Sequence, residues 1–299
     1  MTHPVDTTPP PPRARGADHE EGLLEGAAGA QLHWQRWLPS GPPLAVVVLA
    51  HGVGEHSGRY EHVAARLTRA QYAVYALDHR GHGRSSGPRA DIDRMEYAVE
   101  DLNRLVTLAA SRHPDTSVHL LGHSMGGCIA LAYAIRHQHR LHGLLLSSAA
   151  ATLESAPRAA RLGAEALSAV TPRAEILELD PWMLSRDEAV VRAYNEDPLV
   201  HHGKLPARTV AEIAAAVERL PDAVPALRLP VLIMAGTADH IVPPSGSRMV
   251  HARAGSVDRT LRMYDGLYHE LFHEPEKGVV LGDVVAWLDA RTEKEETHG

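Results

Sequence analysis

The stretch Ser117-Val-His-Leu-Leu-Gly-His-Ser-Met-Gly-Gly-Cys-Ile-Ala-Leu-Ala132 joins a short apolar run to a helix-forming run through the pattern Gly-x-Ser-x-Gly. This context predicts a sharp strand-to-helix turn with a serine at its apex. The chain crosses itself closely in such a turn, so the positions two before and two after the serine need to lack side chains. Gly122 and Gly126 meet this requirement. Ser124 is therefore the candidate nucleophile.

A second stretch, Gly83-Arg-Ser-Ser-Gly87, fits the same short pattern. It follows Asp78-His-Arg-Gly-His82 instead of a strand, and Pro88 stands where a helix would have to begin. We therefore interpret the second match as a loop.

Composition sets the class of protein. The chain has 299 residues, 44% of them hydrophobic, which is enough for a substantial core. The formal charge of −7 argues against a nucleic-acid partner, which would need a clustered basic face. Cys128 is the single cysteine, so an internal disulfide is impossible, and we expect it to be a buried packing residue.

Apolar runs alternate with helical patterns along most of the chain. The segment Gln31–Trp37 has the two-residue period of an antiparallel edge strand. Other runs are apolar throughout, as strands covered on both faces must be: 44–50, 73–77, 118–121, 144–146 and 231–235. A helix is predicted over 93–111, where apolar residues recur every three or four positions. The pattern predicts an α/β fold with a mostly parallel central sheet and helices on both faces.

This alternation stops between about Ala150 and Leu229, where Ala- and Leu-rich helical pieces are broken by seven prolines. We predict a helical cap insertion at 150–229, carried by a core formed from 22–149 and 230–292. Residues 1–21 have the composition of a disordered Pro-rich tail, and 293–299 that of a charged, frayed end.

The first residues lack the basic start and apolar core of a signal peptide, and no apolar run reaches the ~18 residues of a membrane span. The sequence therefore predicts a cytoplasmic protein, or one held peripherally at a membrane. Oligomeric state cannot be read from the sequence.

A serine hydroxyl needs an imidazole to take its proton and a carboxylate to orient that imidazole. Asp239 follows the apolar run 231–235 and a glycine turn, and His269 follows the next predicted strand, 260–264. The chain order Ser, Asp, His is one of those known for such triads. We predict that Ser124, His269 and Asp239 form a catalytic triad.

The developing oxyanion needs two N–H donors. Met125, at the start of the helix after the serine, supplies one by its position. The loop His51-Gly-Val-Gly-Glu-His-Ser-Gly-Arg-Tyr60 follows the apolar run 44–50, and its glycines permit close approach to the site. We predict the Val53 N–H as the second donor.

Together, five stretches resemble the monoacylglycerol lipases of the α/β-hydrolase superfamily: 51–60, 78–85, 122–127, 194–200 and 237–239. The resemblance extends from about Gly29 to Leu288. It implies an α/β-hydrolase fold and hydrolysis of monoacylglycerols to glycerol and fatty acid, without metal or cofactor, under a helical cap. It also places Glu55, Arg59, Tyr194 and His273 near the glycerol end of the substrate. For Glu55 and Arg59 an ion pair with a structural role remains an equal alternative.

The sharp turn around Ser124, which we call the elbow, indicates that the reaction is acyl transfer. It does not indicate which alcohol leaves, so a carboxylesterase or lysophospholipase of broader specificity is the alternative function. Apolar side chains of the cap would pack on the core, line an acyl tunnel or contact membrane or lipid aggregates. The segment His269-Glu-Leu-Phe-His273 also fits the zinc motif His-Glu-x-x-His. A turn before it and Pro275 after it argue against the continuous helix that zinc binding requires.

Overall fold

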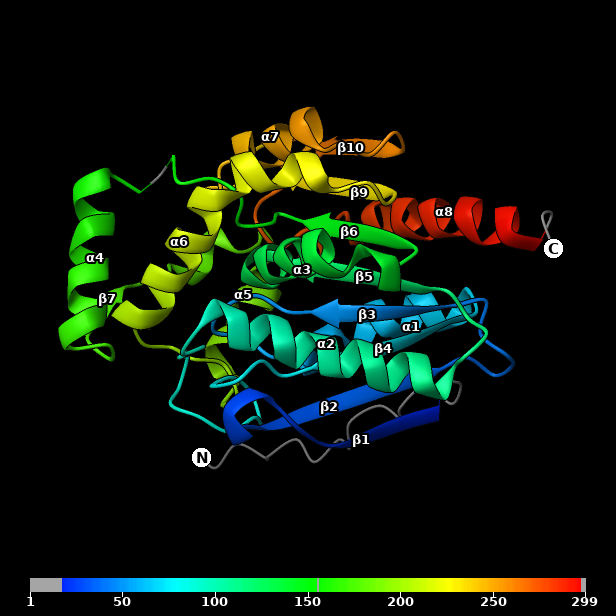
Figure 1. The fold of residues 1–299 in the computed structure, drawn as a ribbon, viewed down its shortest axis with the longest axis horizontal. Helices are drawn as coiled ribbons and strands as arrows, with labels where there is room; N and C mark the ends of the chain where they lie inside the picture. The colour runs from blue at the N-terminus through cyan, green and yellow to red at the C-terminus, as the bar shows by residue number, and fades with distance from the viewer. Residues whose placement is uncertain (1–17, 155, 297–299) are drawn as a thin grey trace, which may run out of the picture.

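The computed structural model describes residues 18–154 and 156–296. Its main sheet has eight strands in the order β1-β2-β4-β3-β5-β6-β9-β10 (Figure 1). From β4 to β10 neighbouring strands are parallel, which confirms the predicted sheet. Every residue is buried in each of the five central strands: β3 (Ala45–Ala50), β4 (Tyr72–Leu77), β5 (Val118–His123), β6 (Gly143–Ser147) and β9 (Val231–Gly236). The strand β10 (Arg259–Tyr264) forms one edge.

The opposite edge differs from the prediction. Strand β2 (Gln31–Leu38) is antiparallel, as predicted, but it lies between β4 and another strand, β1 (Asp18–Glu25). The expectation of a disordered tail is therefore wrong for residues 18–21, while residues 1–17 lie outside the described residues. Because β1 is an exposed edge strand rich in acidic side chains, its composition resembles that of a solvated tail.

Helices cover both faces of the sheet. Helices α2 (Met95–Arg112) and α3 (Ser124–His137) cover one face, and α1 (Glu61–Arg69) and α8 (Lys277–Glu296) cover the other (Figure 1). Helix α7 (Ser245–Arg253) packs beside β9 and β10. Helix α8 continues to Glu296, so it includes residues 293–296 of the stretch that we expect to be a frayed end. The Lys and Glu residues that give this stretch the composition of a solvated chain end are also residues with a high helix propensity.

Between β6 and β9 the chain forms the predicted insertion, which we call the cap (residues 150–229). It contains α4 (Arg158–Val170), β7 (Glu175–Leu177), α5 (Glu188–Glu196), β8 (Leu205–Pro206) and α6 (Ala207–Ala223). Helix α4 projects from the molecule and packs mainly on α6 (Figure 1). The second half of α6 returns to the core, where Ala216, Val217 and Leu220 are buried.

Short 3-10 helices link several elements: η1 (Ala27–Gly29), η2 (Ser57–Tyr60), η3 (Gln138–Arg140), η4 (Pro181–Met183), η5 (Val224–Ala226) and η6 (Leu271–His273).

Cys128 is buried on α3, as predicted, and burial raises the pKa of its thiol to about 12. Among the residues that the structure describes, no helix combines the length and apolar character needed to cross a membrane.

Candidate active site

The turn between β5 and α3 has the strained geometry that the sequence predicts. Ser124 has a φ of 53°, a conformation that residues other than glycine seldom adopt. A Cβ at Gly126 would lie 2.2 Å from the Ala50 carbonyl oxygen, and one at Gly122 would lie 2.5 Å from the Gly126 carbonyl oxygen. Only glycine fits at either position, because both contacts are with backbone atoms that cannot turn aside.

Three side chains from distant parts of the sequence meet above this turn. The Nε2 atom of His269 lies 2.9 Å from the Ser124 hydroxyl, and its Nδ1 atom lies 2.7 Å from Oδ2 of Asp239. The second oxygen of Asp239 accepts hydrogen bonds from the Ile241 and Val242 N–H groups, each at 2.9 Å. The carboxylate thus orients the imidazole and shapes its own turn at the same time.

The electrostatics of the pair favour an orienting carboxylate and a basic imidazole. Burial alone would lower the pKa of His269, but Asp239 and, from farther away, Glu270 and Glu55 together outweigh it, so the pKa lies above the ordinary 6.5. Burial alone would raise the pKa of Asp239, yet the imidazole and two N–H donors hold it below 3.8. Asp239 is therefore ionised at neutral pH.

The second Gly-x-Ser-x-Gly match is a loop, as the sequence indicates. The Ser85 hydroxyl donates to the Asp78 carbonyl oxygen and accepts from the His33 N–H. The bond with His33 holds the loop against β2, and the bond with Asp78 joins Ser85 to the residue that follows β4. Ser85 has no hydrogen bond to an imidazole that could activate it among the described residues.

The loop after β3 is held close to the elbow by Glu55. Its Oε1 atom accepts hydrogen bonds from the Gly52 N–H at 2.6 Å and from the Tyr60 hydroxyl at 2.7 Å. These bonds fix the segment that carries Val53, which borders the same cavity as Ser124. Met125 is in the first turn of α3, where backbone N–H groups have no partner within the helix.

The cavity at Ser124 is small, about 20 Å³. Polar groups of the core line one part of this cavity. The cap residues Leu179, Leu184 and Tyr194 and the core residue Ile241 line another part. The full lining consists of Gly52, Val53, Glu55, His123, Ser124, Leu179, Leu184, Tyr194, Ile241, His269 and Glu270. The Glu270 N–H donates to the Leu184 carbonyl oxygen at 2.8 Å, which ties the loop of His269 to the cap. The cap therefore lies closed over the triad in this structure.

The residues predicted at the glycerol end divide into two groups. Glu55 and Tyr194 line the cavity, whereas Arg59 and His273 lie behind its wall. The Arg59 guanidinium donates to Glu55 at 2.6 Å and lies 4.8 Å from the centre of the Tyr194 ring. The ion-pair alternative for Glu55 and Arg59 is thus part of the structure.

Sequence reasoning missed Glu270, which also lines this cavity. Its carboxylate receives two N–H groups of Arg59, at 2.6 and 2.7 Å. The signal was its position directly after the predicted catalytic histidine, inside a motif that was considered only as a zinc site.

The zinc alternative is wrong for His269 and His273, because the two histidines turn to different partners. His269 lies between Ser124 and Asp239, and Nε2 of His273 lies 3.1 Å from the Arg59 carbonyl oxygen. The 3-10 helix η6 has three residues and contains His273 but not His269, so no continuous helix carries both histidines. Within the described ranges, one group of potential metal ligands does converge, with Glu55, His123 and Glu270 atoms within 4.8 Å of one another. Arg59 already supplies a positive charge to both of its carboxylates.

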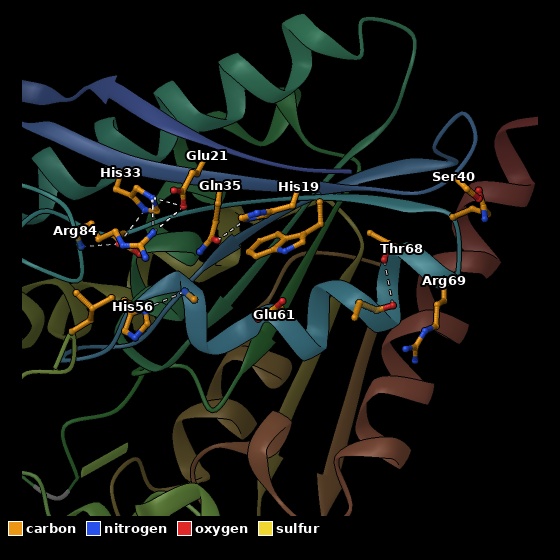
Figure 2. Close-up of a pocket in the computed structure, with 16 residues that line it drawn as sticks. His19, Glu21, His33, Gln35, Ser40, His56, Glu61, Thr68, Arg69 and Arg84 are labelled. Carbon is orange, nitrogen blue, oxygen red and sulfur yellow. Dashed lines mark hydrogen bonds and ion pairs between the residues drawn. The ribbon is translucent and has the colours of Figure 1, made fainter. Parts of the chain in front are cut away.

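A larger cavity, of about 560 Å³, lies away from the triad, between β1, β2 and α1 (Figure 2). At one end His33 lies between the carboxylates of Glu21 and Asp78, and Arg84 pairs with Glu21. This larger cavity contains none of the triad residues.

The parallel sheet, the strained serine turn and the hydrogen-bonded Ser–His–Asp set define an α/β-hydrolase. Comparison with known proteins agrees. The family model described as serine aminopeptidase, S33, matches residues 41–276. A monoacylglycerol lipase of Mycolicibacterium smegmatis is 42% identical over 90% of this chain and 96% of its own, and rat monoglyceride lipase is 37% identical over 90% of each.

A solved structure supports the same relationship. The monoacylglycerol lipase of Paleococcus ferrophilus is 33% identical, with a TM-score of 0.78 over 87% of this chain and 99% of its own. The chain belongs to the monoacylglycerol lipase family of serine hydrolases.

Proposed function

We propose that this enzyme hydrolyses monoacylglycerols to glycerol and a free fatty acid through an acyl-enzyme at Ser124. The supporting observation is the set of two hydrogen bonds that join Ser124, His269 and Asp239 at the elbow. Relatives that are 37–42% identical over most of the chain are monoacylglycerol lipases, which supports the substrate.

In the proposed mechanism His269 takes the proton of Ser124 as its oxygen attacks the ester carbonyl carbon. Asp239 keeps the imidazole in the required tautomer and stabilises the imidazolium. The Val53 and Met125 N–H groups bind the oxyanion, and together such donors contribute on the order of several kcal/mol to transition-state stabilisation. His269 then gives the proton to the leaving glycerol oxygen, and later activates water against the acyl-enzyme.

The cap has to move during this cycle. An acyl chain does not fit into a cavity of about 20 Å³, and Leu179, Leu184 and Tyr194 close that cavity from the cap side. We infer that the cap opens to admit the substrate. Helix α4 packs mainly on α6, which is itself part of the cap.

We further propose that the cap contacts lipid surfaces. Six large apolar side chains are exposed on it: Leu162, Leu167, Val170, Leu177, Trp182 and Met183. In the part of the chain that the structure describes, exposed large apolar residues outside the cap are fewer and lie far apart in the sequence. An exposed apolar group beside the entrance to an ester-binding site suits a substrate that is delivered from a membrane or a lipid aggregate.

A substrate panel tests the proposed function. Steady-state rates are measured for mono-, di- and triacylglycerols, lysophospholipid and short p-nitrophenyl esters. We expect the highest kcat/KM for a monoacylglycerol. Preference for short soluble esters with monoacylglycerols ignored would instead support a general carboxylesterase, and preference for the lysophospholipid would support a lysophospholipase.

A further inference from the structure

One carboxylate of the triad cavity has no assigned role. Glu270 follows His269 directly, and only 3% of its surface is exposed. Its side chain shares a wall of the cavity with Glu55 and His123, and atoms of these three groups lie within 4.8 Å of one another. The ring centres of His123 and His269 are 4.8 Å apart. This wall is therefore on the His269 side of the cavity, where the leaving alcohol takes its proton.

The wall carries more negative than positive charge. Burial alone would raise the pKa of Glu55 and of Glu270, but Arg59 and the neighbouring hydrogen-bonding and basic groups together outweigh it and hold both below 4.5, so both are ionised. Burial lowers the pKa of His123 to about 4, so its ring is neutral at pH 7. Two carboxylates thus face one guanidinium. A further anion, brought to this wall by a substrate, would be repelled.

Each of the two carboxylates keeps one oxygen that can accept another hydrogen bond. Oε1 of Glu55 already accepts from the Gly52 N–H and the Tyr60 hydroxyl, and its Oε2 accepts from Arg59. Each oxygen of Glu270 accepts one N–H of Arg59, and His273 lies 3.4 Å from Oε2. A carboxylate oxygen accepts about two hydrogen bonds, so Oε2 of Glu55 and Oε1 of Glu270 each keep a free lone pair. Glu270 is the one that follows His269 directly in the chain.

We propose that Glu270 determines the specificity for the leaving alcohol by accepting a hydrogen bond from a free hydroxyl of the glycerol head group and by excluding head groups that carry a phosphate. The inference rests on the proposed function. The leaving oxygen lies beside His269, and the free hydroxyls of a monoacylglycerol are on the carbon atoms next to it in the same head group. A buried acceptor matched to a hydroxyl discriminates strongly against esters that lack it.

Three esters with one acyl chain test the proposal: 1-lauroylglycerol, methyl laurate and 1-lauroyl lysophosphatidic acid. The variant Glu270→Gln keeps the shape of the side chain and removes its charge. We expect its kcat/KM for 1-lauroylglycerol to fall about ten-fold, because a neutral amide oxygen accepts a hydrogen bond more weakly than a carboxylate does. We expect the value for methyl laurate to change less than about two-fold, and the rate on the phosphate ester relative to 1-lauroylglycerol to rise about ten-fold.

Two further variants separate specificity from structure. Glu276→Gln removes the same charge from the same loop, where Glu276 is exposed and pairs with Arg186, and should leave the three-ester ratios unchanged. Glu270→Asp keeps the charge on a shorter side chain, so it should still exclude the phosphate ester while losing part of the preference for 1-lauroylglycerol. Thermal unfolding of each variant shows that it is folded.

The outcomes are distinct. If Glu270→Gln lowers kcat/KM for all three esters equally, or changes none, Glu270 only holds Arg59 and the proposal is overturned. Where Glu270→Gln does not fold, the wild-type enzyme decides, because equal kcat/KM on 1-lauroylglycerol and on the phosphate ester overturns the proposal. A wild-type enzyme that cleaves methyl laurate and ignores 1-lauroylglycerol would overturn the proposed function instead.

Discussion

His269 is set between carboxylates that act on it from several directions. Asp239 lies 2.7 Å from its Nδ1 atom, while Glu270 and Glu55 act from farther away, and all three raise its pKa against the effect of burial. His123 and Arg59 are further basic groups on this side of the site. A base with a pKa above 6.5 is neutral, and able to take the Ser124 proton, only above that pKa.

The pH dependence of the reaction follows from this. We predict that kcat/KM on a soluble ester falls on the acid side as His269 becomes protonated, with a half-maximal point above pH 6.5. The measurement is a pH–rate profile at constant ionic strength. A half-maximal point well below pH 6.5 would show that the carboxylates do not outweigh burial.

At the scale of elements, the junction of β3, β5 and α3 sets the geometry of the site. The backbone of α3 passes so close to the end of β3 that a Cβ at Gly126 would lie 2.2 Å from the Ala50 oxygen and 2.3 Å from the His51 oxygen. His51 begins the loop that carries Val53. The same contact therefore positions both the nucleophile and the predicted oxyanion donor.

This contact makes Gly126 sensitive to substitution. We predict that Gly126→Ala destabilises the protein by roughly 1–3 kcal/mol, because the added methyl group has to displace backbone. Gly163→Ala, where a Cβ meets nothing within 4 Å in the exposed helix α4, is the control and should be neutral or stabilising by up to about 1 kcal/mol. Chemical denaturation measures both. Equal stabilities of the two variants would refute the close approach.

At the scale of the whole molecule, the cap combines a closed cavity with an exposed apolar surface. The exposed residues Trp182 and Met183 lie in the chain between Leu179 and Leu184, two of the side chains that close the triad cavity. Contact of that exposed group with lipid would thus act on the segment that must move for the substrate to enter.

The cap surface can be tested apart from the chemistry. We predict that Trp182→Ser weakens binding to phospholipid vesicles and lowers activity on aggregated monoacylglycerol several-fold, since each buried apolar side chain contributes about 1.5–3 kcal/mol. Activity on a soluble p-nitrophenyl ester should stay unchanged. Val257→Ser is a matched control, because Val257 is fully exposed outside the cap. Equal losses in both variants would contradict the proposed role of the cap.

Much of this architecture is predictable from the sequence, because its strongest signals are local. The apolar runs predict the central strands, and the glycines around Ser124 predict the elbow. The order of Asp239 and His269 after two strands also predicts which side chains meet. The prediction fails for β1, an edge strand with the composition of a tail, and for Glu270, whose place in the wall depends on the distant residue Arg59. His273 lies behind that wall for the same reason.

Covalent labelling tests the central claim most directly, because the chain holds two Gly-x-Ser-x-Gly serines. After reaction with a fluorophosphonate, peptide mass spectrometry locates the modified residue. We predict one adduct in the wild-type enzyme, on Ser124. In Ser124→Ala we predict that no adduct forms and that esterase activity falls by at least about four orders of magnitude. An adduct on Ser85, or an active Ser124→Ala enzyme, would contradict the account.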